Sequence, residues 1–69
     1  MSNWKQNDYD MAKKAEDIVK AEVKNNNYMY VAEKLKENTY RVSVRNPDTT
    51  ENIGFFTVDT NSGKILYED

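Results

Sequence analysis

The hydrophobic period of this chain changes at Tyr28, and that change restricts the fold more than any other feature of the sequence. Before Tyr28, apolar residues recur at the spacing of one helical face. After it, apolar and polar residues alternate with a period of two, as in strands that bury one face. The apolar helical positions are Met11, Ala12, Ala15, Ile18, Val19 and Val23. One N-terminal helix followed by strands is therefore predicted.

The helix is predicted over residues 7–24, because the run of three asparagines that follows tolerates the left-handed conformation that ends helices. Four strands are predicted in "YMYVAEKL", "TYRVSVR", "IGFFTVD" and "KILYE". In the first strand, Met29, Val31 and Leu35 are expected to face the helix, with Tyr28, Tyr30 and Ala32 on the opposite face. In the second strand, the expected inward residues are Tyr40, Val42 and Val44.

These elements predict an α+β fold, in which one helix packs on a four-stranded antiparallel β-meander. A chain of 69 residues makes one small domain. We assign residues 8–69 to that domain and residues 1–7 to an N-terminal arm. The arm contains Trp4, which is expected to fold back onto the helix or to serve as a free anchor.

The composition argues against most catalytic chemistry. The chain has no cysteine and no histidine, and without them zinc sites, Ser-His-Asp triads and Cys-His nucleophiles cannot be built in their common forms. Asp48 and Glu51 could pair as acid and base, but so small a domain offers little room for a substrate cleft. We therefore expect no enzymatic activity, no cofactor and no metal.

Charge and hydropathy bear on partners and location. The net charge is −2, without the basic excess typical of nucleic-acid or membrane-surface proteins. No apolar run approaches the roughly 20 residues of a membrane span, and the first residues lack the layout of a signal peptide. We expect a cytoplasmic location if the chain is full length and an extracytoplasmic one if it is an excised domain.

The stretch from Asp59 to Lys64 joins two strands that must pair antiparallel. A short hairpin of this kind needs a residue with positive φ, which Gly63 adopts without steric cost. Asp59 is expected to accept hydrogen bonds from backbone N–H groups of the turn. The same stretch also resembles the start of a calcium loop, but Gly63 stands at the fifth position, where an EF-hand needs a ligand. A structural hairpin turn is the preferred interpretation.

Several segments of the chain together resemble the PepSY domain family. That family has a leading helix rich in alanine, a strand with a tyrosine followed by alternating valines, and a closing V-D-x-x-[ST]-G-K segment. Here the tyrosine strand is "YRVSV" and the closing segment is "VDTNSGKIL". The resemblance covers residues 8–68. It implies an α+β fold and a binding or inhibitory module related to peptidase propeptides, with no catalytic residues.

Five residues are candidates for partner binding, because the alternation places aromatic rings beside arginines on the face away from the helix. They are Tyr28, Tyr30, Arg41, Arg45 and Phe55. Tyrosine and arginine are enriched at protein interfaces, and exposed rings can also stack on single-stranded nucleic acid. A third interpretation is that these side chains only pack along the sheet as cross-strand neighbours.

A second candidate surface is the last strand, which is expected at a sheet edge. Its residues Ile65, Leu66 and Tyr67 could pair with a strand of a partner or of a second copy. The preferred function is a non-catalytic protein-binding module, in the role of an inhibitor or regulator of a peptidase or another larger protein. The alternatives are a small cytoplasmic protein of a phage or mobile element that binds and blocks a host protein, and a single-stranded nucleic-acid binder; a bacterial or phage source is expected.

Overall fold

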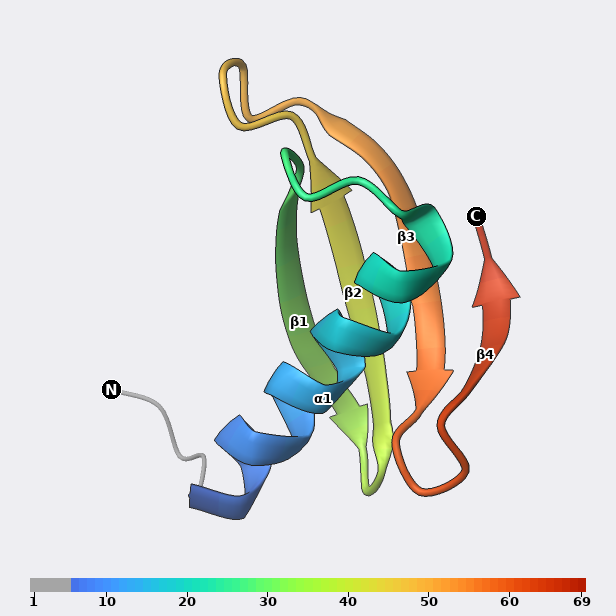
Figure 1. Ribbon diagram of the computed structural model, residues 1–69. Coiled ribbons are helices and arrows are strands. Elements are labelled where there is room, and N and C mark those ends of the chain that lie inside the picture. The colour runs from blue at the N-terminus through green and yellow to red at the C-terminus, as the bar shows by residue number, and fades with distance from the viewer. Residues whose placement is uncertain (1–5) are drawn as a thin grey trace.

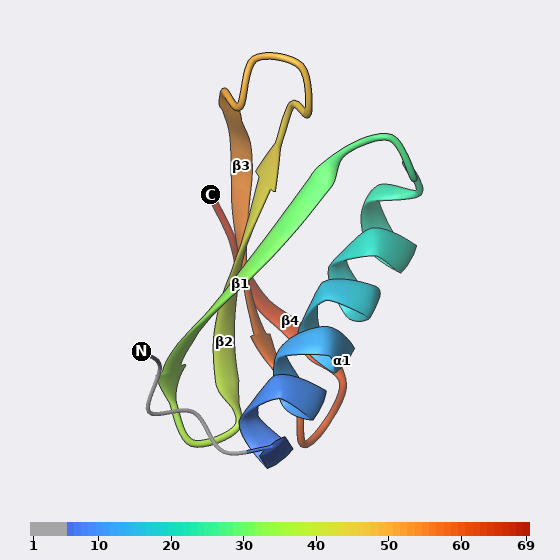
Figure 2. The same ribbon diagram turned by 90° about the vertical axis from the view of Figure 1, so that its left-hand side faces the viewer.

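The computed structural model describes residues 6–69, which form one helix and one sheet in two layers (Figures 1 and 2). The four strands are hydrogen-bonded in the order β1-β2-β3-β4, and each neighbouring pair is antiparallel. The elements are α1 (Gln6–Val23), β1 (Met29–Lys36), β2 (Thr39–Arg45), β3 (Asn52–Asp59) and β4 (Lys64–Glu68). The predicted α+β fold is confirmed.

The ends of the helix differ slightly from the prediction. α1 begins at Gln6, so it includes two residues that the sequence analysis placed in the arm. It ends one residue early, because Lys24 takes the left-handed conformation (φ 60°) that was expected of the asparagines. Trp4 lies outside the described residues. No helix within residues 6–69 is long and apolar enough to cross a bilayer.

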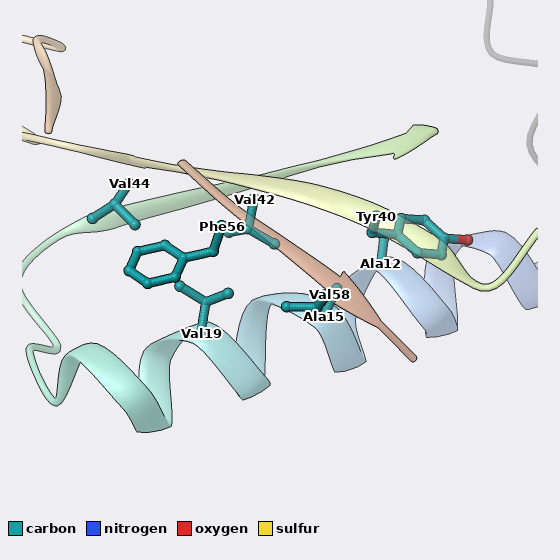
Figure 3. Packing of buried hydrophobic residues seen from close by; sticks show 8 residues of the cluster. All are labelled: Ala12, Ala15, Val19, Tyr40, Val42, Val44, Phe56 and Val58. Carbon is teal, nitrogen blue, oxygen red and sulfur yellow. The ribbon is translucent and has the colours of Figure 1, made fainter. Parts of the chain in front are cut away.

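The core lies between α1 and the covered face of the sheet (Figure 3). The helix contributes Ala12, Ala15 and Val19, and their small size allows the helix backbone to approach the strands closely. Burial of this apolar surface is the main source of stability, at about 25 cal/mol per Å². The sheet contributes Tyr40, Val42, Val44, Phe56 and Val58. The predicted helical stripe and the predicted inward face of β2 are confirmed.

The predicted orientation of β1 is wrong. Tyr30 pairs with Val44 and Ala32 with Val42, so these β1 residues share the covered face with the core of β2. Tyr28 also packs against the core. Met29, Val31 and Leu35 point to the other face and are exposed. A polar contact favours the observed orientation, because the Tyr30 hydroxyl donates a 2.5 Å hydrogen bond to the Asn25 carbonyl after the helix.

The β1–β2 turn and the β3–β4 turn lie at the same end of the sheet and contact each other (Figure 1). Gly63 has a φ of 76°, and its N–H donates to the Asp59 carbonyl over 2.8 Å. The Asp59 carboxylate accepts the N–H of Asn61 at 2.8 Å, as predicted. Thr60 is fully buried, and both its N–H and its hydroxyl donate to the carbonyl of Asn38 in the β1–β2 turn. Thr60 therefore links the two hairpins.

Candidate protein-binding surface

One face of the sheet is left uncovered by α1 (Figure 2). The strand register defines this outer face: Glu33, Arg41, Thr57 and Tyr67 form one row across all four strands, and Val31, Ser43 and Phe55 form the next. Side chains alternate between the faces of a strand. Met29 and Leu35 therefore extend the outer face along β1.

A contact between Arg41 and Phe55 occupies the middle of the outer face. The guanidinium carbon of Arg41 lies 4.1 Å from the centre of the Phe55 ring. Such cation–π contacts contribute about 0.5–1 kcal/mol at exposed sites. Both residues are half-buried, because each covers part of the other. The contact presents an aromatic ring and a cation in a fixed arrangement on two neighbouring central strands.

Large apolar side chains lie on both sides of this contact. Met29 is 42% exposed, Val31 44% and Leu35 50%, all on β1, and Tyr67 on β4 is 67% exposed. Scattered exposed apolar residues are ordinary, but a group on one rigid face can mark an interface. These three β1 residues were predicted to lie in the core. Tyr67 was predicted only as part of the edge strand.

The structure brings together only two of the five predicted partner-binding residues, Arg41 and Phe55. Arg45 lies farther along β2, where its guanidinium donates a 3.2 Å hydrogen bond to the Thr50 carbonyl in the β2–β3 loop. Tyr28 and Tyr30 lie on the covered face. Tyr28 borders a hollow of about 260 Å³ near the end of α1, lined also by Ile53, Phe56 and neighbouring residues.

The described groups with shifted pKa values lie between α1 and the β1–β2 hairpin. Burial raises the pKa of Tyr30 and of Tyr40. A 2.8 Å hydrogen bond to Asp8 raises the pKa of Lys34. Burial also raises the pKa of Glu16, and a hydrogen bond with the Ala32 backbone lowers it by a smaller amount. Each shift follows from a contact that joins the helix to the sheet.

Residues 6–69 contain no group of three or more acidic side chains placed to hold a metal ion. The outer face presents the Arg41 guanidinium, the rings of Phe55 and Tyr67, aliphatic side chains of β1, and the polar side chains of Glu33 and Thr57. Comparison of the chain with protein-family models, with curated proteins and with solved structures found no significant match.

Proposed function

We propose that this protein is a non-catalytic binding module that holds a protein partner on its outer face. The observation that carries the proposal is the Arg41–Phe55 contact, which is flanked by exposed Val31 and Tyr67. Arginine and aromatic residues dominate the binding energy of protein interfaces when they lie centrally and are surrounded by apolar contacts. A rigid sheet loses little conformational entropy on binding.

The resemblance to PepSY domains supports a regulatory or inhibitory role for this module, directed at a peptidase or another larger protein. The closing segment of the resemblance, from Val58 to Leu66, lies in the β3–β4 hairpin. This hairpin contributes Tyr67 to one border of the outer face. In the proposal, the family-like hairpin acts as a scaffold and the outer face acts as the contact surface.

A protein partner is favoured over single-stranded nucleic acid. A stacking platform needs rings with a free face. With Tyr28 and Tyr30 on the covered face, the outer-face rings are Phe55 and Tyr67, and Arg41 covers one side of Phe55. The acidic net charge of −2 also opposes attraction to phosphate groups.

The test compares three forms of the protein as bait in a lysate of the source organism. The double variant Arg41→Ala, Phe55→Ala removes the central contact. The control variant, Tyr9→Ala with Lys13→Ala, removes one exposed ring and one exposed cation from α1. A partner retained by the parent and the control should bind the outer-face variant roughly 10–100-fold more weakly. Thermal unfolding must show that all three forms are folded.

Equal binding of such a partner by the outer-face variant and the parent would contradict the proposal. Loss of that partner by the control alone would place the interface on α1 instead. Binding of the identified partner to each purified form then gives the ratio of the affinities of the parent and the outer-face variant.

A further inference from the structure

The two edges of the sheet differ in whether another strand can pair with them. At the β1 edge, α1 lies against the strand and contacts it more extensively than any other strand. Lys34 points to the covered face, where its ammonium lies 2.8 Å from Asp8. A charge that points inward from an edge strand is a common device against edge-to-edge pairing.

The β4 edge is the one that α1 contacts least, and Glu68, which lies on the covered face opposite Phe56, is exposed. Within residues 6–69, no side chain is hydrogen-bonded to the backbone of β4. The N–H of Phe55 donates to the carbonyl of Asp69, and the N–H of Asp69 donates to the carbonyl of Phe55. In an antiparallel pair, successive residues direct their backbone groups alternately toward the neighbouring strand and away from it. The N–H and C=O of Glu68 therefore point away from β3, toward the open edge. Leu66 and Tyr67 are exposed beside these free backbone groups.

The charges of β4 are complementary to those of a second, antiparallel copy. The strand reads Lys-Ile-Leu-Tyr-Glu from Lys64 to Glu68. β4 has a bulge in its register with β3, so Lys64, Tyr67 and Asp69 lie on the outer face, whereas Ile65 and Glu68 lie on the covered face. When two copies pair antiparallel with Leu66 opposite Tyr67, each Lys64 lies opposite Asp69 of the other copy on the same face. In this register two ion pairs flank an apolar centre.

The arrangement also selects against the parallel orientation, in which Lys64 would lie beside Lys64 of the other copy. Like charges directly opposite each other destabilise strand pairing. The antiparallel orientation is the one that a twofold axis generates, so the same strand serves both subunits. β4 is therefore complementary to itself in the geometry that homodimers use.

We infer that the protein forms a twofold-symmetric dimer by antiparallel pairing of β4 with β4 of a second copy. The two four-stranded sheets then become one continuous sheet, with both helices on one side and both outer faces on the other. An open hollow of about 540 Å³ lies between α1 and the start of β4 and is lined by Ile18, Ala21 and Ile65 among others. The second copy adjoins this hollow and shields its apolar residues from water.

The dimer is tested by sedimentation equilibrium of the full chain from about 10 µM to about 1 mM, a range that detects weak association. The parent should shift with concentration from its monomer mass of 8.1 kDa to twice that value. A single 8.1 kDa species throughout this range would overturn the inference. The interface is small, so a concentration-dependent equilibrium is expected rather than a permanent dimer.

Charge reversal locates the interface. Lys64→Glu makes both ends of β4 acidic, and Glu68→Lys with Asp69→Lys makes both ends basic. Each variant alone should associate about 10-fold more weakly than the parent, because like charges then face each other at both ends. An equimolar mixture should recover dimers, since each acidic end now lies opposite a basic one. Recovery requires that both variants are folded, so misfolding cannot imitate it.

Undiminished association of either variant alone would overturn the β4 interface, and so would a mixture that associates no better than its components. The proposed outer-face function is tested separately by Arg41→Ala with Phe55→Ala, which leaves the β4 edge intact. Loss of the partner and loss of the dimer are therefore distinguishable outcomes.

Discussion

β1 and β4 are both edge strands of one sheet, but α1 holds them differently. α1 contacts β1 most extensively and β4 least, as its diagonal path across the sheet shows (Figure 1). β1 is tied to the helix by polar groups: Lys34 binds Asp8, and the Ala32 backbone is hydrogen-bonded to Glu16. Among residues 6–69, β4 pairs with β3 alone, and it packs on the core through half-buried Ile65.

This difference shows that the apolar stripe of the helix does not hold the whole sheet. The buried residues of the stripe are two alanines and one valine, and they face the central strands. The edges depend on other contacts, which are hydrogen bonds and an ion pair at β1. We therefore expect substitutions at the core, at β4 and at β1 to produce effects of decreasing size.

The largest expected effect is at the centre of the helix stripe. Val19 is fully buried, whereas neighbouring Ile18 is half-buried and borders the open hollow beside β4. Val19→Ala should lower the free energy of unfolding by about 2–3 kcal/mol, because it leaves a cavity. Ile18→Ala should cost only about 1 kcal/mol, although it removes more atoms, since part of the side chain is already exposed to water.

Urea unfolding of both variants measures this difference. With a slope of about 1 kcal/mol/M for a small domain, Val19→Ala should lower the midpoint by at least about 2 M and Ile18→Ala by about 1 M. A loss at Ile18 equal to that at Val19 would show that the β4 side is packed as tightly as the centre.

A smaller effect is expected in the β3–β4 turn. Gly63 has a φ of 76°, and a Cβ atom added there would have no neighbour within 4 Å. The cost of Gly63→Val is therefore conformational, about 1–2 kcal/mol for a residue held in the left-handed region. Ser62→Ala, one residue earlier and exposed, is the control and should change the free energy of unfolding by less than about 0.5 kcal/mol.

Thermal unfolding compares the two turn variants. Equal, small shifts of the midpoint would contradict a strained conformation at position 63. The β1–β2 turn offers a contrast, because the residue with a left-handed backbone conformation there is Asn38, with a φ of 63°. Asparagine tolerates this conformation better than valine does, so Asn38→Gly should leave the midpoint nearly unchanged.

The contrast between the two edges also explains what could be predicted from the sequence. The helix, the four strands and the Gly63 turn follow from local chemistry and periodicity, and each lies close to its predicted position. The orientation of β1 could not be obtained in this way, since both of its faces carry apolar residues. Met29, Val31 and Leu35 are the more hydrophobic set, yet Tyr30 and Lys34 reach polar partners near the two ends of α1. Asp8 is distant from Lys34 in the sequence, and neither contact produces a periodic signal.

The candidate surface was predictable in part for the same reason. Arg41 and Phe55 lie on strands with a clear alternation, and their assignment to the outer face follows from period two. Their contact depends on the register between β2 and β3, in which Phe55 lies opposite Ser43. Tyr67 reaches the outer face because a bulge shifts the register within β4. Alternation from Ile65 alone would place Tyr67 on the covered face.

The smallest effect is expected at the β1 edge, where the free energy of unfolding should decrease as the pH becomes alkaline. The hydrogen bond from Lys34 to Asp8 raises the pKa of Lys34 above its ordinary value of 10.5. The folded protein therefore holds this proton more tightly than the unfolded chain. The resulting stabilisation is complete below pH 10.5 and is lost as the pH rises through the higher pKa of the folded state. Burial raises the pKa values of Tyr30 and Tyr40, which adds a loss in the same direction.

Urea unfolding of the parent from neutral pH to about pH 11.5 should show a stability that declines above about pH 10. Lys34→Met keeps the aliphatic part of the side chain and removes the charge, so its decline should be shallower. Asp8→Asn should produce the same shallower curve, because it removes the partner rather than the lysine. If both variants decline as steeply as the parent, the ion pair does not hold the β1 edge. The two edges would then differ only in their contact with the apolar stripe of α1.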